Sequence, residues 1–254
     1  MEAETIVTAC VLIIGNEILS GRTQDINLNY LAIGLNEAGI RLREARVIPD
    51  IDAVIIATVN EVRPKYDYIF TTGGIGPTHD DITSECVARA FGVKLVLHQE
   101  AKQILEAHYK GRMGPDAELN EARLRMAHVP EGATLIYNPV SGASGFRIEN
   151  VFVMAGVPAI MQAMFEEVKS GLKGGRPVLA RSLACRLGEG TLARGLGEIQ
   201  ARYPDVDIGS YPWFRNGALG VSLVARSPDE ARLALAANEV AALIRSLGDT
   251  PVEE

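Results

Sequence analysis

The chain has 254 residues, of which 47% are hydrophobic and 22% charged, and its formal net charge is −7. This composition is typical of a globular protein. The acidic balance argues against nonspecific binding to nucleic acid or to an anionic membrane, because both need a basic surface. Three scattered cysteines form neither a zinc motif nor a disulfide framework, and the N-terminus is acidic where a signal peptide would be basic. We therefore expect a cytoplasmic protein.

The first two thirds of the chain alternate strand-like and helix-like segments. Apolar, β-branched runs predict strands over residues 5–14, 41–48, 68–72, 93–97 and 151–154. Helical spacing predicts a helix from Asn27, as its N-cap, to about residue 38, and others over 52–62, 80–91, 99–128 in two pieces, and from Pro158 onward. This alternation predicts an α/β fold with a doubly wound, mostly parallel sheet.

The segment 171–177 is rich in glycine and ends in proline, so we interpret it as a linker. Residues 1–170 then form the larger, ligand-binding domain. Residues 178–254 follow the order strand, helix, strand, strand, helix, which predicts a second, small α+β domain with frayed C-terminal residues.

The most informative segment runs from residue 71 to residue 83, directly after a predicted strand. It contains Gly73, Gly74 and Gly76, which allow close approach of a ligand to the backbone. Exposed amide groups there, with the N-terminus of the next helix, form a cradle for an anion. The segment lacks the Gly-Lys-Ser/Thr of a Walker A loop and the third glycine of the dinucleotide fingerprint. A tight turn with an acidic N-cap is the alternative interpretation.

Acidic residues follow three predicted strands. Asp80 and Asp81 come after the third strand, Glu17 after the first and Asp50 after the second. Because the carboxyl ends of parallel strands meet at one edge of a sheet, we expect these four carboxylates to form a cluster. Like charges repel unless a cation intervenes, so the cluster predicts an Mg²⁺ site. Taken singly, Glu17 and Asp50 also fit solvated loop acids.

Two later glycine-containing segments are weaker candidates for ligand binding. One comprises Ser141, Gly142 and Gly145, and the other comprises Gly156 and Pro158. Either could be an ordinary turn. Pro158 suits the first position of a helix, whose free N–H groups would then face a second anionic group.

Several of these motifs resemble the molybdopterin-binding MoaB/Mog-like family, in the form found in the N-terminal half of the competence-damage protein CinA. The strongest is residues 71–81, which match "TTGG-[LIT]-GPT-x-DD" closely. Residues 156–158 with Met161 resemble "PGVPxEM", although Ala155 replaces the usual proline. The resemblance also covers residues 15–21 with Asn27 and Asn29, residues 47–50, and residues 203–212, the last in the small domain shared with eukaryotic FAD synthases. No segment resembles the amidase domain that often follows in CinA.

The resemblance implies a phosphate-bearing ligand, either a pterin such as molybdopterin or a dinucleotide, and a homo-oligomeric protein. It also implies a divalent cation, Mg²⁺ or another such as Co²⁺, held by Asp80, Asp81 and Glu17, with Asp80, Asp81 and Asp50 as catalytic residues. The implied ligand-binding residues are Thr71, Thr72, Gly73, Gly74, Gly76, Thr78, Ser141, Gly142, Gly145, Gly156 and Pro158.

Three functions remain open on the sequence. The first is metal-dependent hydrolysis of a nucleotide pyrophosphate bond, as in ADP-ribose or FAD. The second is adenylyl transfer to molybdopterin in molybdenum cofactor biosynthesis. The third is a non-catalytic module that binds a pterin or a nucleotide. The additional small domain favours the CinA-type interpretation, because Mog-type proteins are usually single domains.

Overall fold

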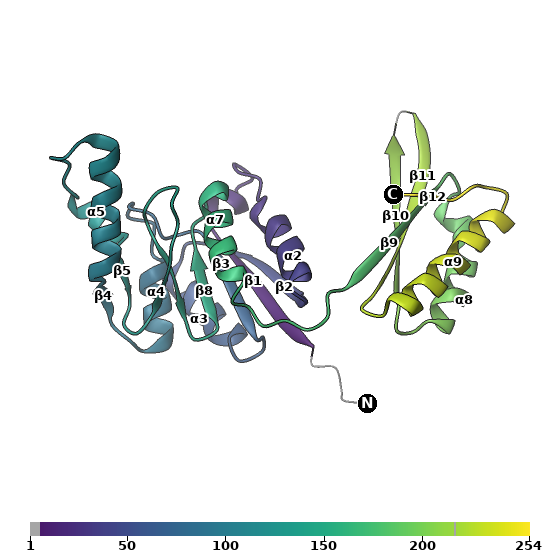
Figure 1. The fold of residues 1–254 in the computed structure, drawn as a ribbon, viewed down its shortest axis with the longest axis horizontal. Coiled ribbons are helices and arrows are strands. Elements are labelled where there is room, and N and C mark those ends of the chain that lie inside the picture. Colours follow the sequence, from purple (N-terminus) through teal and green to yellow (C-terminus); the bar gives the residue numbers. More distant parts are fainter. Residues whose placement is uncertain (1–5, 216) are drawn as a thin grey trace. The chain divides into compact units, whose positions relative to one another are not determined.

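The computed structural model describes residues 6–215 and 217–254. It divides the chain into two compact units, Met1–Gly175 and Arg176–Glu254 (Figure 1). The division falls inside the segment 171–177 that the sequence marks as a linker. The first residue of the strand predicted over 5–14 lies outside the described residues. No helix in the described part of the chain is long and apolar enough to cross a membrane.

Unit 1 is built on a six-stranded sheet with the order β2-β1-β3-β8-β7-β6. The first four strands in this order are parallel to one another, whereas β7 is antiparallel to both β8 and β6. The predicted α/β fold with a mostly parallel sheet is therefore confirmed. The strands are β1 (Val7–Ile14), β2 (Ile40–Ile48), β3 (Tyr68–Thr72), β6 (Thr134–Ile136), β7 (Gly145–Ile148) and β8 (Val151–Met154).

Helices cover both faces of this sheet (Figure 1). Alternate residues of β1 explain why, since successive side chains of a strand point to opposite faces. Ala9, Val11 and Ile13 pack with α2 (Asn27–Glu37) and α7 (Pro158–Lys169). The intervening residues pack with α3 (Asp52–Val62) and α4 (Thr83–Phe91). A strand buried on both faces needs a continuous apolar run, which the sequence of β1 provides.

The remaining elements of unit 1 are short except for one helix. They are α1 (Asn16–Leu19), β4 (Leu95–Leu97), α5 (Gln99–Met113), α6 (Glu121–Arg125) and β5 (His128–Pro130). β4 and β5 form a separate antiparallel pair. The two helical pieces predicted over 99–128 are therefore shorter than expected, and the strands β5, β6 and β7 were not predicted.

One predicted helix start and one predicted helix cap are wrong. The helix expected from Asp80 begins at Thr83, after a turn. The helix expected from Asn27 spans Asn27–Glu37, but its N-cap residue is Ile26, and Oδ1 of Asp25 accepts a hydrogen bond of 2.9 Å from the backbone N–H of Leu28. Asn27 is thereby free to bond elsewhere, as described below.

Unit 2 is a four-stranded antiparallel sheet with the order β10-β11-β9-β12. Its core joins inward-facing residues of the sheet to both of its helices, so the second, smaller α+β region is present as expected. The C-terminal residues expected to fray instead include a short edge strand, β12. The elements are β9 (Leu179–Cys185), α8 (Glu189–Arg202), β10 (Asp207–Arg215), β11 (Ala218–Ser227), α9 (Glu230–Ser246) and β12 (Val252–Glu253).

Candidate functional site

A cavity of about 550 Å³ lies in unit 1 beside the loop that follows β3. The loops after β1, β3 and β8 and the loop before β7 all contribute to its lining. Segments from four distant parts of the sequence therefore converge on one space. The predicted site residues that line it are Glu17, Gly73, Gly74, Gly76, Asp81, Ser141, Gly156 and Pro158.

The glycine-rich loop is fixed by its neighbours on both sides. Gly73 and Gly74 have φ angles of 102° and 69°, in the left-handed region that favours glycine. A Cβ on Gly73 would overlap the carbonyl oxygen of Ile14, and one on Gly74 would overlap Oγ1 of Thr83. The Gly73 N–H donates to the carbonyl of Met154 at 3.1 Å, and the Thr83 N–H donates to the carbonyl of Gly74 at 2.9 Å. The loop is thus seated on the ends of β1 and β8 and on the start of α4.

Asp81 closes the same loop back on itself. Its Oδ2 accepts hydrogen bonds from the backbone N–H of Thr78 at 2.8 Å and from Oγ1 of Thr78 at 2.5 Å. A Cβ on Gly76 would lie 2.6 Å from the same oxygen, so the carboxylate packs directly against the glycine backbone. Asp81 therefore both shapes the loop and lines the cavity, whereas Thr78 is bonded to Asp81 and is not part of the lining.

Asp50 and Asp80 lie outside the cavity lining. Oδ2 of Asp50 accepts a hydrogen bond of 2.8 Å from the backbone N–H of Asn16, which fixes the start of α1. Asp80 is exposed. Its Oδ1 lies 4.0 Å from Nδ1 of His79, which is itself almost fully exposed.

The expected cluster of four carboxylates is therefore wrong. In the part of the chain that the structure describes, no group of three or more His, Cys, Asp or Glu residues is placed to hold a metal ion. Only Glu17 and Asp81 face the same cavity. Each of these acids follows a strand of the parallel sheet, as the sequence indicated. Their side chains nevertheless bind different partners in the folded chain.

Four other predicted residues serve the packing beneath the cavity. Thr71 and Thr72 are buried at the end of β3, with exposed fractions of 0% and 2%, and neither lines the cavity. Gly142 has no room for a side chain because a Cβ there would lie 2.5 Å from Cβ of His108. At Gly145 a Cβ would meet the carbonyl oxygen of Val153. Close packing therefore requires glycine at both positions. A glycine in the sequence does not reveal whether the residue contacts a ligand or lies in a closely packed turn.

Two buried asparagines shape the cavity walls and were not predicted to do so. Nδ2 of Asn27 donates to the carbonyl of Gly156 at 2.8 Å, and Asn27 is only 4% exposed. Oδ1 of Asn138 accepts from the backbone N–H groups of Val140 and Ser141, both at 2.9 Å. The sequence predicted Asn27 as a helix cap and assigned no role to Asn138, because the backbone groups that these side chains bind are identified only in the folded chain.

Much of the remaining lining of the cavity is apolar. It includes Tyr109 of α5, Met126 after α6 and Ile160 of α7. The guanidinium carbon of Arg123 lies 4.4 Å from the centroid of the Tyr109 ring, a cation–π distance. No site residue was predicted in the segment 99–128. Its helical pattern does not indicate which side chains reach the cavity beside the glycine-rich loop.

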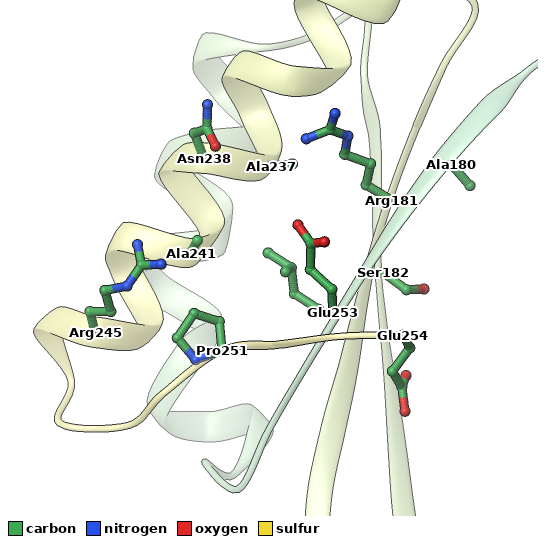
Figure 2. Close-up of a pocket in the computed structure, with 11 residues that line it drawn as sticks. Ala180, Arg181, Ser182, Ala237, Asn238, Ala241, Arg245, Pro251, Glu253 and Glu254 are labelled. Carbon is green, nitrogen blue, oxygen red and sulfur yellow. The ribbon is translucent and has the colours of Figure 1, made fainter.

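Unit 2 contains a separate polar hollow of about 370 Å³ between α9 and the strands β9 and β12. Figure 2 shows Arg181, Asn238, Arg245 and Glu253 around it. Glu253 pairs with Leu183, two residues from Arg181, so both charged side chains lie on the helix-covered face at the edge of the sheet. Inward-pointing charges at an edge strand discourage pairing with another chain. None of the predicted residues lies in this hollow, so we place the candidate site in unit 1.

Comparisons with known proteins identify the families that the two units resemble. The family model described as "Probable molybdopterin binding domain" matches residues 10–180, and the one described as "FAD synthase, middle domain" matches residues 177–248. A protein from Archaeoglobus fulgidus is 34% identical over 225 residues, which cover 89% of this chain and 93% of that protein.

Two CinA relatives give the form of the family. A CinA-like protein from Citrifermentans bemidjiense is 40% identical over 161 residues, and the match covers 62% of this chain but only 38% of that protein. The crystal structure of the protein CinA from Thermoplasma acidophilum, described as of unknown function, is 31% identical with a TM-score of 0.59, over 65% of this chain and 98% of that chain. The chain therefore belongs to the MoaB/Mog-like molybdopterin-binding domain family, in its CinA-like form.

Proposed function

We propose that the cavity in unit 1 binds a nucleotide through its phosphate groups, and that the chain hydrolyses a pyrophosphate bond in a substrate such as ADP-ribose or FAD. The observation that carries this proposal is the convergence of two glycine-containing turns with Glu17 and Asp81 around one space. Water would attack one phosphorus as the bond to the bridging oxygen breaks. From ADP-ribose the products would be AMP and ribose 5-phosphate.

Phosphate binding is supported by the bare backbone of the two turns. A Cβ on Gly156 would lie 3.3 Å from Cα of Gly73, so the turn before α7 is in close contact with the loop after β3. Neither turn carries a side chain at this point of contact. Phosphate oxygens can then reach backbone N–H groups directly, aided by the positive end of the α7 dipole.

The apolar wall supports a ligand with a flat ring. Tyr109 presents an aromatic surface to the cavity, and the Arg123 guanidinium lies over its ring. A purine, flavin or pterin ring would pack against such a surface with the offset or edge contacts that aromatic groups prefer. Phosphates on the glycine-rich loop and a ring on the Tyr109 side together match the shape of a nucleotide.

The charge of the lining supports a divalent cation. Glu17 and Asp81 are the charged residues that line the cavity, and both repel a phosphate. Two carboxylates together with phosphate oxygens and water form the donor set that Mg²⁺ usually takes. The residues present therefore fit a cation that binds jointly with the ligand, with Oδ1 of Asp81 and the Glu17 carboxylate as its protein donors. Such a cation would offset charge that develops on phosphate oxygens during hydrolysis.

The test is mass-spectrometric identification of products from ADP-ribose, FAD and ATP with Mg²⁺ or Co²⁺. We expect AMP from ADP-ribose, loss of this activity in Asp81→Asn, and full activity in Asp116→Asn, which removes an exposed acid outside the cavity. We also expect the affinity for AMP to rise when Mg²⁺ is added, because Mg²⁺ would offset the negative charge of the cavity that repels the phosphate of AMP.

Other results would favour the other two functions. Consumption of ATP only when molybdopterin is present would indicate adenylyl transfer in place of hydrolysis. Tight binding of nucleotides without turnover under any metal would indicate a binding module. Equal activity of Asp81→Asn and the wild-type chain would contradict the placement of the chemistry in this cavity.

A further inference from the structure

A smaller cavity of about 170 Å³ adjoins the candidate site. The two cavities share Ile75, Gly76 and Asp81 as lining residues. Because Gly76 has no side chain, the boundary at this residue consists of backbone alone. A ligand that lies on the glycine-rich loop is therefore adjacent to the smaller cavity. The other residues around it are Ser84, Glu85, Leu95, Arg125 and His128.

The smaller cavity has an arginine, a permanently cationic group that the larger one lacks. Neither Lys, Arg nor His lines the larger cavity in the described part of the chain, whereas Arg125 and His128 line the smaller one. Nδ1 of His128 lies 3.0 Å from the carbonyl oxygen of Leu124. A carbonyl can only accept, so Nδ1 carries the proton, and in the neutral ring Nε2 is an acceptor; the donors to an anion in this cavity are therefore Arg125 and Ser84.

The Arg125 guanidinium is available for a ligand. Within residues 6–215 and 217–254 it forms no ion pair within 4.0 Å, although Asp81 and Glu85 line the same small space. It also lies at the end of α6, on a different element from the acids. A guanidinium presents paired N–H donors that match two oxygens of one phosphate. The Ser84 hydroxyl on the first turn of α4 adds a further donor.

We propose that the smaller cavity is a second anion subsite, which holds the distal phosphate of a diphosphate ligand through Arg125. The inference rests on the proposed function, because it takes the first phosphate to lie on the glycine-rich loop. The two phosphates would then lie on either side of Gly76, with their bridging oxygen beside Asp81. The site would select diphosphate ligands over monophosphates, since a monophosphate fills only the first position.

The experiment compares ligands that fill one position or both. Affinities of the full chain for inorganic pyrophosphate, ADP-ribose and AMP are measured by calorimetry with Mg²⁺, for the wild type, Arg125→Gln and Arg125→Lys. Arg112→Gln is the matched control, because Arg112 is an exposed arginine of the neighbouring α5 and lines neither cavity. Far-UV circular dichroism establishes that each variant is folded.

We expect Arg125→Gln to weaken pyrophosphate and ADP-ribose binding by about 10- to 100-fold, the range for a lost charge-assisted hydrogen bond. AMP affinity should change less than about twofold, and Arg125→Lys should recover part of the loss. The subsite would be overturned if Arg125→Gln weakened the binding of AMP and ADP-ribose equally. It would also be overturned if the wild type did not bind pyrophosphate, or if Arg125→Gln bound pyrophosphate as tightly as the wild type. If pyrophosphate binding depends on Arg125 but no nucleotide binds, the subsite stands and the proposed nucleotide function fails.

Discussion

Substitution of Gly73 by alanine tests whether the loop after β3 is built as described. The φ angle of Gly73 is 102°, and its added Cβ would lie closer than 3.0 Å to the carbonyl oxygen of Ile14. That oxygen belongs to the backbone of the buried central strand β1, so it cannot move aside as a flexible side chain would. The loop itself must shift, and with it the wall of the cavity.

The expected loss of stability has two parts. A left-handed backbone conformation costs an L-residue about 1–2 kcal/mol relative to glycine. Overpacking against a rigid neighbour adds about 1–3 kcal/mol. Gly132 provides the matched control, since its φ is 83° and nothing lies within 4 Å of an added Cβ. Gly132→Ala should therefore lose only the stability that the left-handed backbone costs, whereas Gly73→Ala should also lose stability through overpacking against Ile14.

Thermal unfolding followed by two probes measures this difference. Trp213 is the only tryptophan of the chain and lies in unit 2, so its fluorescence reports on unit 2, whereas far-UV circular dichroism reports on both units. At about 2–4 °C per kcal/mol, Gly73→Ala should melt about 2–12 °C below Gly132→Ala by circular dichroism, with the fluorescence transition unchanged. Equal melting temperatures for the two variants would refute the close contact with Ile14.

Three further predictions concern unit 1 or the whole chain. Hydrogen bonds from Arg46, and then from a nearby lysine, lower the pKa of Glu61 to about 2 from 4.5. Because the folded-state pKa is depressed, this stabilisation is complete above pH 4.5 and is lost as the pH falls toward 2, so Glu61→Gln should reduce the drop in urea midpoint over that interval. All three cysteines are buried, and burial raises the pKa of each thiol, so Ellman's reagent should react only after unfolding; rapid reaction of the native chain would contradict the packing. Asn27→Asp removes the donor to the Gly156 carbonyl and should destabilise unit 1 by about 1–3 kcal/mol in urea unfolding and weaken AMP binding, whereas Asn29→Asp, at an exposed position, should do neither.

The fold of unit 1 was predictable because its central strands have a strong local signal. One set of alternate residues of β1 packs against α2 and α7, and the other set packs against α3 and α4. A strand buried on both faces must be apolar throughout, and the sequence of β1 has this pattern. The strands β5, β6 and β7 have three or four residues each, and their sequences include Pro130 and Gly145. Segments this short become strands only through pairing with partners that the local sequence does not reveal.

The site was predictable to the level of segments but not of side chains. Asp80 and Asp81 are adjacent and chemically identical, so no sequence pattern separates them. In the folded chain, two hydrogen bonds from Thr78 hold the Asp81 carboxylate against Gly76, while Asp80 is exposed. The helix expected from Asp80 begins only at Thr83, and the intervening turn decides which acid faces the cavity.

The same hydrogen bonds explain why the predicted acids lie in different surroundings in the folded chain. Asp50 accepts from the backbone N–H of Asn16, and one oxygen of Asp81 accepts from Thr78, so both carboxylates fix loops beside the cavity. Glu17 follows directly after the segment that Asp50 holds. An acid that satisfies a backbone N–H lowers the free energy of one loop conformation in the absence of any ligand. Glu17 and Asp81 are thus positioned by hydrogen bonds of the chain itself, and the proposed function gives the cation the separate role of offsetting the charge of a bound phosphate.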